Sequence, residues 1–354
     1  MAVVSSQSQE LRDGTPKGGI EPWIGFGRFS LAGCRPFWGV VADGLVTSLA
    51  SIEHAERPMG VAGESSSMDD WWRQWGRIVG KAESSVQRRA AAGPKHDWLP
   101  LQAVKIHAPL MPRQVFCTIA NYRSGVLQSM SDQAKADNVD AAGLAAAAAQ
   151  ACQRRKQGEP YASAKLPGSI VGPFDTMSLP AHVEQPDWEV ELGVVIGKPA
   201  RHVSRERAME HVAAYTVVND VTVREKVSRA SPQGMGTDWL AAKNAPGFLP
   251  LGPWLVPSAH VANPYDLSMT LRLNGILMQC ERAGDMIFDI AEQIAYLSRQ
   301  TCLLPGDLIC TGSPAGFGLH YGRFLRPGDI VEAGIEGLGQ QRNLCVRETR
   351  QDET

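Results

Sequence analysis

The alternation of apolar and polar positions predicts strands through much of residues 112–348. Residues 187–197, DWEVELGVVIG, are an aromatic and β-branched run that ends in glycine, which is typical of a strand. Residues 214–220, AYTVVND, indicate a buried strand, and Asn274-Gly275 between alternating apolar residues predicts a hairpin. Short strands with closely spaced turns and few helices predict a mixed α/β fold that is mostly β and not doubly wound.

Several segments have apolar residues at helical spacing or a helix-favouring composition. Residues 69–92 carry Trp71, Trp72 and Trp75, which we interpret as core or interface residues and not as a ligand cage. Residues 204–213 and 286–300 also indicate helices. Residues 130–157 are rich in alanine, which favours a helix that either covers a site as a lid or faces solvent.

These patterns divide the chain into two domains between polar ends. The hairpin signal Ala42-Asp43-Gly44 lies in a smaller β-rich domain over residues 20–111, and a proline-punctuated connection leads to a larger domain over residues 112–348. The larger domain carries an insertion at residues 130–160. Residues 1–19 and 349–354 are predicted to be tails.

The composition limits which partners and which cellular compartment we expect. The chain has 354 residues, of which 44% are hydrophobic and 20% charged, with a formal net charge of -2, so neither nucleic acid nor an acidic membrane is an expected partner. Seven cysteines without CxxC pairs argue against a disulfide framework. No apolar leader and no run of about 18 apolar residues is present, so we predict a cytoplasmic protein with no membrane span.

The clearest candidate site is a pair of acids on the predicted strand. Glu189 and Glu191 are two residues apart and therefore share a face, and Asp220 ends the next predicted strand. Neighbouring carboxylates in apolar surroundings must be protonated, paired with bases or neutralised by a cation such as Mg²⁺. The alternative from these residues alone is an exposed edge strand with a stripe of solvated glutamates.

Other catalytic motifs are absent from the sequence. It has no HExxH, no GxSxG and no strand-GxGxxG-helix pattern. The glycine-rich turn at residues 311–318, TGSPAGFG, lacks the Gly-Lys-Ser/Thr ending of a phosphate loop. Nucleotide binding at this turn is therefore not predicted.

A set of motifs in one order resembles the fumarylacetoacetate hydrolase family. Over roughly residues 112–346 the motifs are FCTIANY, KLPGSIVGP, DWEVELGVVIGK, Asn219-Asp220 with Arg224, AAKNAPGFLPLGP, NGILMQ, DMIFDI, PGDLICTGSPAGFG and PGDIVEAGIEGLG. The resemblance implies a β-roll catalytic domain, usually in a homodimer, and the first hundred residues are loosely similar to the family's smaller N-terminal domain. It also implies Mg²⁺ or Mn²⁺ held by Glu189, Glu191 and Asp220.

The resemblance further implies roles around a small anionic dicarbonyl or 2-oxo acid substrate. Lys243 would face the developing oxyanion, and the Thr311 hydroxyl with backbone N–H groups such as that of Gly312 would bind a substrate carboxylate or carbonyl. Lys165 and Arg224 would add positive charge. Alternatives from the residues remain open: Arg224 pairs with Glu225 or Asp220, Lys165 is a solvated loop lysine, and Tyr122 is a pocket wall and not an acid.

The chain departs from the family pattern at one place. Hydrolytic members follow Asn-Tyr with a histidine and a glutamate that activate water, and here these positions fall on Gly125 and Gln128. Neither side chain can take a proton at neutral pH. The insertion could bring a replacement carboxylate over the site, and its candidates are Asp132, Asp137, Asp140 and Glu159.

Three hypotheses follow from the sequence. The first is a metal-dependent hydrolase that cleaves a carbon-carbon bond in an acylpyruvate or fumarylacetoacetate-like diketo acid, as in the catabolism of aromatic compounds. The second is decarboxylation, keto-enol isomerisation or dehydration of a 2-oxo acid on the same site, for which no activated water is needed. The third is an inactive binding or scaffold protein.

Overall fold

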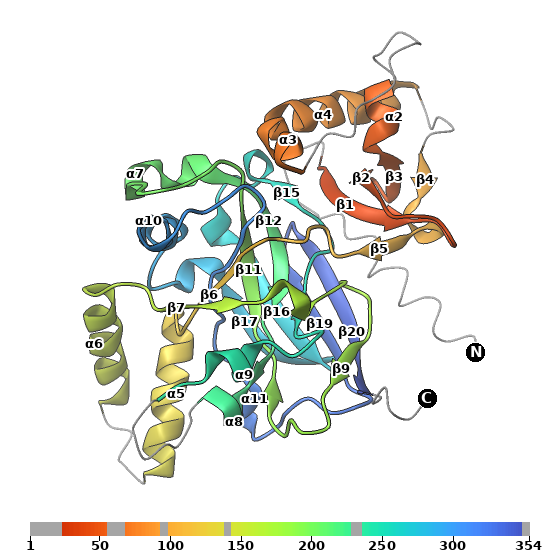
Figure 1. Cartoon of the computed structure of the whole chain (residues 1–354). Helices are drawn as coiled ribbons and strands as arrows, with labels where there is room; N and C mark the ends of the chain where they lie inside the picture. The colour runs from red at the N-terminus through yellow and green to blue at the C-terminus, as the bar shows by residue number, and fades with distance from the viewer. Residues whose placement is uncertain (1–22, 55–67, 93–97, 138–142, 228–235, 349–354) are drawn as a thin grey trace.

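The computed structural model describes residues 23–54, 68–92, 98–137, 143–227 and 236–348. The predicted tails and Asp140 lie outside these ranges. The fold is mixed α/β, as the sequence predicted, with two larger sheets in the second part of the chain and one sheet in the first (Figure 1).

The first part of the chain is a five-stranded sheet in the order β4-β3-β2-β1-β5. Its strands are β1 (Gly25–Ser30), β2 (Phe37–Ala42), β3 (Leu45–Ser48), β4 (Leu99–Pro100) and β5 (Lys105–His107). Asp43 and Gly44 turn the β2–β3 hairpin with positive φ angles of 49° and 69°, as the sequence predicted.

Three helices accompany this sheet: α2 (Leu49–His54), α3 (Met68–Arg73) and α4 (Trp75–Ala92). The single helix predicted over residues 69–92 is therefore broken at Gln74. The interpretation of the tryptophans as packing residues is confirmed for Trp72 and Trp75, which are buried with ring centroids 5.4 Å apart. Trp75 Nε1 donates to the carbonyl oxygen of Ala213 at 3.0 Å and so joins α4 to the second part of the chain.

A six-stranded sheet in the order β15-β12-β11-β18-β6-β7 forms the centre of the molecule. Its strands are β6 (Val115–Thr118), β7 (Ala162–Lys165), β11 (Val190–Ile196), β12 (Val212–Asn219), β15 (Val256–Pro257) and β18 (Leu308–Cys310). Every residue of β11 and β12 is buried, because both strands have neighbours in the sheet and consist mainly of apolar residues.

The second sheet has the order β17-β16-β19-β20-β9, and two short strand pairs lie beside it. The strands are β8 (Ile170–Val171), β9 (Met177–Leu179), β10 (Pro186–Asp187), β13 (Thr222–Val223), β14 (Leu249–Pro250), β16 (Ser268–Leu273), β17 (Ile276–Arg282), β19 (Ile330–Ile335) and β20 (Gly339–Arg347). The predicted hairpin at Asn274-Gly275 joins β16 to β17.

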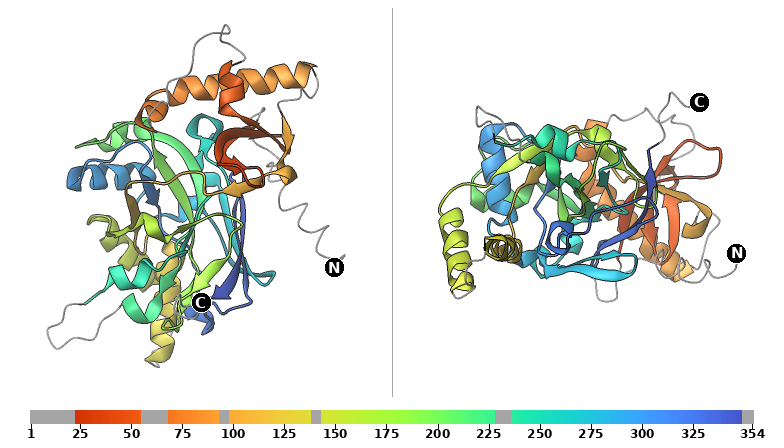
Figure 2. Two further views of the ribbon diagram at one scale, coloured as in Figure 1. Left: turned by 45° about the vertical axis from the view of Figure 1, so that its right-hand side comes forward. Right: turned by 90° about the horizontal axis from the view of Figure 1, so that it is seen from below.

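The remaining α-helices of the described ranges are α5 (Arg123–Ala136), α6 (Leu144–Lys156), α7 (Arg205–Ala208), α8 (Arg224–Val227), α9 (Trp239–Lys243), α10 (Ile290–Gln300) and α11 (Gly318–Tyr321). The alanine-rich insertion is thus two helices and not one, and they lie at the opposite end of the molecule from α2 to α4 (Figure 2). Helix α10 begins later than predicted because Asp289 caps it in a capping box with Glu292. No helix in the described ranges is long and apolar enough to cross a bilayer.

Gly193 allows the close packing at the centre of β11. A Cβ at this position would lie 2.8 Å from both Thr216 Cγ2 and Val218 Cγ2, which are stiff β-branched side chains of β12. We expect Gly193→Ala to lower the free energy of unfolding by about 1–3 kcal/mol through overpacking. Denaturant unfolding followed by circular dichroism measures this change.

The matched control is Gly334→Ala in β19, where the nearest atom to a new Cβ is Gln340 Cγ at 3.4 Å. This variant should be neutral or slightly stabilising, since alanine restricts the unfolded chain. Equal stability of the two variants would contradict the packing account of Gly193.

Candidate active site

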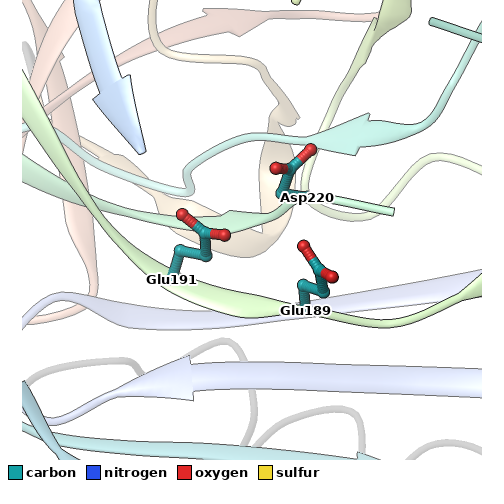
Figure 3. Close-up of side chains that lie close together, drawn as sticks. All are labelled: Glu189, Glu191 and Asp220. Atoms are coloured by element: carbon teal, nitrogen blue, oxygen red, sulfur yellow. The ribbon is translucent and has the colours of Figure 1, made fainter. Parts of the chain in front are cut away.

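Glu189, Glu191 and Asp220 form a buried acidic cluster. One carboxylate oxygen from each lies within 4.8 Å of the others, and the three carboxylates point toward one another (Figure 3). The expectation of an exposed edge strand is therefore wrong, because β11 has strands on both sides and all three acids are buried.

The pairing of β11 with β12 fixes these positions. Val190 is opposite Asn219, so the residues just before β11 and just after β12 lie side by side. The Asp220 N–H donates to the carbonyl oxygen of Glu189 at 2.8 Å, and the Glu189 N–H donates to Asn219 Oδ1 at 2.9 Å. The cluster is thus built by backbone register and by hydrogen bonds at the strand ends.

Two buried lysines neutralise Asp220. Lys165 Nζ lies 2.6 Å from Asp220 Oδ1, and Lys243 Nζ lies 2.5 Å from Asp220 Oδ2 and 3.2 Å from Glu189 Oε2. Burial by itself would raise the pKa of Asp220, but the two ammonium groups outweigh it and hold the pKa well below its ordinary value. Asp220 is therefore an anion at neutral pH.

Glu191 lacks such compensation. Burial and the charges of Asp220 and Glu189 raise its pKa well above the ordinary value, although the Gly312 N–H donates to its Oε2 at 2.7 Å. A third carboxylate that does not ionise easily beside two others indicates a place for an additional cation. The oxygen-only donor set suits a hard divalent ion such as Mg²⁺ or Mn²⁺, so the residues fit the metal that the sequence suggested.

Arg224 pairs with two acids that the sequence analysis did not propose as its partners. Its Nε lies 2.7 Å from Asp187 Oδ2 and its Nη2 lies 2.7 Å from Glu189 Oε1, in place of the expected Glu225 or Asp220. Asp187 also accepts from the N–H groups of Gly318 at 2.6 Å and Leu319 at 3.1 Å. Asp187 therefore connects Arg224, the start of α11 and the acidic cluster.

A cavity of about 270 Å³ opens onto Glu189 and Glu191. Arg224 and Lys243 also line it, and most of the remaining wall is apolar. The residues of this wall include Ile119, Tyr122, Val126, Met130, Trp239, Phe317 and Leu319. The cavity thus combines a charged end with an apolar body, as expected of a site for a small organic acid.

The structure places three predicted substrate contacts away from the cavity. Lys165 does not line the cavity, and its three N–H donors bind Asp220 Oδ1 and the carbonyl oxygens of Val221 and Phe248, so it is not a solvated loop lysine. The Thr311 hydroxyl donates to the carbonyl oxygen of Leu192 at 3.0 Å. The Gly312 N–H is bound to Glu191.

Tyr122 lies in the cavity wall, which is the alternative that the sequence analysis gave to a role as an acid. Its hydroxyl is buried and donates to Met269 Sδ at 3.3 Å. Burial raises the pKa of Tyr122 well above its ordinary value, so the phenol keeps its proton.

The family model described as "Fumarylacetoacetate (FAA) hydrolase C-terminal" matches residues 114–346. The chain belongs to the fumarylacetoacetate hydrolase family. The oxaloacetate tautomerase FAHD2B, mitochondrial, of Homo sapiens is 37% identical over 270 residues, which are 75% of this chain and 77% of that protein. The 2,4-didehydro-3-deoxy-L-rhamnonate hydrolase of Sphingomonas sp. (strain SKA58) is 43% identical over 187 residues, 52% of this chain and 64% of that protein.

A solved structure shows the same fold. The maleylpyruvate hydrolase from Sphingobium sp. SYK-6, in complex with manganese (II) ion and pyruvate, aligns with a TM-score of 0.65 and 23% identity over 92% of this chain and 100% of that chain. Since the family consists of hydrolases, isomerases and tautomerases, the chain is an enzyme and the hypothesis of an inactive scaffold is not supported.

The positions of the missing dyad are packed into the wall of the site. Gly125 lines the cavity, and Gln128 Oε1 accepts from the Gly316 N–H at 2.7 Å, so Gln128 holds the glycine-rich turn. Sequence analysis missed Asp187, although this residue opens the same motif as the two glutamates. It also missed Trp239 and Phe317, whose place in the cavity wall has no signal in the sequence.

The raised pKa of Glu191 has a measurable consequence in the metal-free protein. A carboxyl whose pKa is raised on folding holds its proton in the folded state, so stability falls as pH rises above its unfolded pKa. We expect the free energy of unfolding of the metal-free protein to fall as pH rises above the ordinary pKa range of glutamate, by up to ~1.4 kcal/mol per pH unit. Asp220 has a lowered pKa and affects stability only at lower pH.

Glu191→Gln should remove this fall with pH and weaken Mg²⁺ or Mn²⁺ binding, as thermal unfolding and calorimetric titration would report. The control is Glu336→Gln, which changes an exposed acid and should retain both the pH slope and the metal. A variant Glu191→Gln that still bound the metal with full affinity would contradict its assignment as a ligand.

Proposed function

We propose that this enzyme catalyses keto-enol tautomerisation of a small 2-oxo acid, with oxaloacetate as the first substrate to test. The observation that carries the proposal is the lack of a water-activating base around the cavity. Of the described side chains that line it, only Glu189 and Glu191 are carboxylates, and both belong to the acidic cluster. In the enol-to-ketone direction the enol hydroxyl gives its proton to solvent and solvent gives a proton to the carbon atom, so the exchange consumes no water and needs no water activated as a nucleophile.

The acids of the insertion do not replace the dyad directly, because each has another partner. Asp132 lies 2.9 Å from His320 Nδ1, Glu159 Oε1 lies 2.6 Å from Arg299, and Asp137 Oδ2 accepts from Gln133 at 2.7 Å. None of these three acids lines the cavity. Hydrolysis by the usual mechanism would lose the ~10² to 10⁴ in rate that a general base supplies.

The charges at the cavity suit an enolate. A divalent ion held by Glu189, Glu191 and Asp220 would supply Lewis-acid polarisation of a 2-oxo group. Lys243 lines the cavity, and its three N–H donors bind Glu189 Oε2, Asp220 Oδ2 and Thr222 Oγ1. It would therefore stabilise negative charge on the substrate oxygen through its own charge and not through a hydrogen bond. Asp220 and Glu189 outweigh the effect of burial and raise the pKa of Lys243, so this group stays charged and acts as an electrostatic partner and not as a base.

A net charge count supports an anionic substrate. Glu189, Glu191 and Asp220 with Lys165 and Lys243 have a formal charge of about -1 when all are ionised, and a divalent ion would change it to about +1. Arg224 and Asp187 balance each other in this count. An organic acid would then enter a site of opposite charge whose remaining wall is mainly apolar.

The test follows the enol form of oxaloacetate by its ultraviolet absorbance, with Mg²⁺ or Mn²⁺ present, and identifies the product by mass spectrometry. We expect faster conversion of enol to ketone without a change in mass. Lys243→Met should lower the rate by about 10²-fold or more, because a positive charge is lost beside the substrate oxygen on which negative charge develops. Lys105→Met, a change in an exposed lysine, is the control and should leave the rate unchanged. Products of smaller mass, or a normal rate for Lys243→Met, would overturn the proposal.

The second candidate is carbon-carbon bond hydrolysis of a diketo acid, the first hypothesis from the sequence. One support is the similarity to 2,4-didehydro-3-deoxy-L-rhamnonate hydrolase. Another is the Asp132–His320 pair, which could activate water in place of the missing histidine and glutamate. Leu319, next to His320, and Ser129, one helical turn before Asp132, both line the cavity.

His320→Asn distinguishes the two candidates. If the reaction is tautomerisation, we expect kcat to stay within about threefold of the parent enzyme, whereas loss of a general base from a hydrolase would cost ~10² to 10⁴. The control is His260→Asn, which changes an imidazole bound to Glu83 in another part of the molecule. A large loss of oxaloacetate tautomerisation in His320→Asn alone would place this pair in the mechanism.

A further inference from the structure

One face of helix α5 forms much of the apolar part of the active-site cavity. Tyr122, Gly125, Val126, Ser129 and Met130 all line the cavity, and their spacing of three and four residues puts them on one side of the helix. Apart from Ser129, the side chains of this face present apolar surface to the cavity, because the Tyr122 hydroxyl is bound to Met269. This face therefore suits an apolar part of a substrate and not a second charged group.

Three further side chains extend the apolar wall beyond α5, namely Trp239, Phe317 and Leu319. Leu319 is 58% exposed although it is a large apolar residue, and Trp239 and Phe317 are half-buried. Removing such surface from water is favourable, so an apolar group that enters the cavity gains free energy from all three side chains.

Both cations of the described cavity wall lie at its charged end. Arg224 Nη2 is 2.7 Å from Glu189 Oε1, and Lys243 Nζ is 3.2 Å from Glu189 Oε2. The Arg224 guanidinium lies 4.9 Å from the centroid of the Phe317 ring. Lys243 Nζ lies 5.9 Å from the centroid of a Trp239 ring. The charged end thus meets the apolar wall at these two rings, and an anionic group farther along the wall would lose hydration without a cation to compensate it.

Gly125 leaves space between α5 and Phe317. A Cβ at this position would lie 3.4 Å from the carbonyl oxygen of Ser313 and 3.5 Å from Phe317 Cε2, so any larger side chain would fill this part of the cavity. Hydrolytic members of the family have a histidine at the position of Gly125. This chain therefore has room beside an aromatic ring where those members have a proton acceptor.

We propose that the preferred substrates are singly charged 2-oxo acids with an aromatic group on C3, and that Gly125 and Met130 select for this group. The carboxylate and the 2-oxo group lie at the charged end, and the aromatic group lies between α5 and Phe317. The inference rests on the proposed tautomerisation and gives it a substrate class. In the enol of phenylpyruvate, as in that of oxaloacetate, the hydroxyl gives its proton to solvent and C3 gains one from solvent, so no further reactant is needed.

The first experiment measures binding without turnover. N-phenyloxamate and N-(carboxymethyl)oxamate share one anionic head group, carry nitrogen in place of C3, and differ in an apolar ring against a second carboxylate. Calorimetric titration of the full chain with Mn²⁺ present should show that N-phenyloxamate binds at least about tenfold more tightly. Equal binding, or tighter binding of the dianion, would overturn the proposal.

The second experiment compares the enols of phenylpyruvate and oxaloacetate by kcat/KM. We expect the value for phenylpyruvate to be at least about tenfold higher. Conversion of oxaloacetate without conversion of phenylpyruvate would overturn this substrate class and leave the proposed tautomerisation standing. Conversion of neither enol, with N-phenyloxamate still bound more tightly, would overturn tautomerisation and support the selection for an aromatic group.

Variants in α5 locate the selecting residues. Met130→Lys places a cation in the apolar wall and should lower the preference for N-phenyloxamate over the dianion by about tenfold or more. The matched control is Leu127→Lys, an exposed position on the same helix that does not line this cavity, and it should keep the preference.

Gly125→Leu tests the same assignment by volume. It should weaken N-phenyloxamate binding about fivefold or more and leave the binding of oxalate, which has the head group alone, unchanged. Retained oxalate binding and an unchanged circular dichroism spectrum show that each variant is folded. A preference that is unchanged in both Met130→Lys and Gly125→Leu would overturn the proposal.

Discussion

Glu189, Glu191 and Asp220 are buried with carboxylate oxygens within 4.8 Å of one another. The cations around them compensate the repulsion between these carboxylates. Carboxylates in such a place repel each other and lose hydration, so the chain must supply positive charge from inside. It does so with Lys165 and Lys243 on Asp220 and with Arg224 on Glu189. Within the described ranges Glu191 has a hydrogen bond from the Gly312 N–H but no cation bound to its carboxylate, which leaves the site one cation short.

The need to compensate buried charges and polar groups also explains why Lys165, Thr311 and Gly312, which the sequence analysis assigned to the substrate, bind protein groups in the structure. A buried ammonium group must have partners for each of its donors, and Lys165 obtains them from Asp220 and two backbone carbonyl groups. It lies behind the acidic cluster, while Lys243 lies at the cavity wall. The two lysines therefore differ in position relative to the cavity, although both bind the same carboxylate.

Gly125 and Gln128, which stand where hydrolytic members have histidine and glutamate, support the shape of the cavity wall. Gln128 binds the Gly316 N–H, and Gly125 leaves room in the cavity next to Ser313 and Phe317. Helix α5 thus still supports the glycine-rich turn, although neither position offers a proton acceptor. The described wall of the cavity combines apolar side chains with the cationic groups of Arg224 and Lys243.

The sequence by itself determined the mixed α/β class, the family and the three acids, because these depend on local alternation, turn residues and an ordered set of motifs. The hairpins at Asp43-Gly44 and Asn274-Gly275 are examples, since backbone conformation with positive φ is a local property. Only the tertiary structure decided which lysine faces the cavity, that Arg224 pairs with Asp187, and that Trp75 binds the carbonyl oxygen of Ala213 in the second part of the chain. These features depend on contacts between segments far apart in the chain, and neither periodicity nor spacing carries information on such contacts.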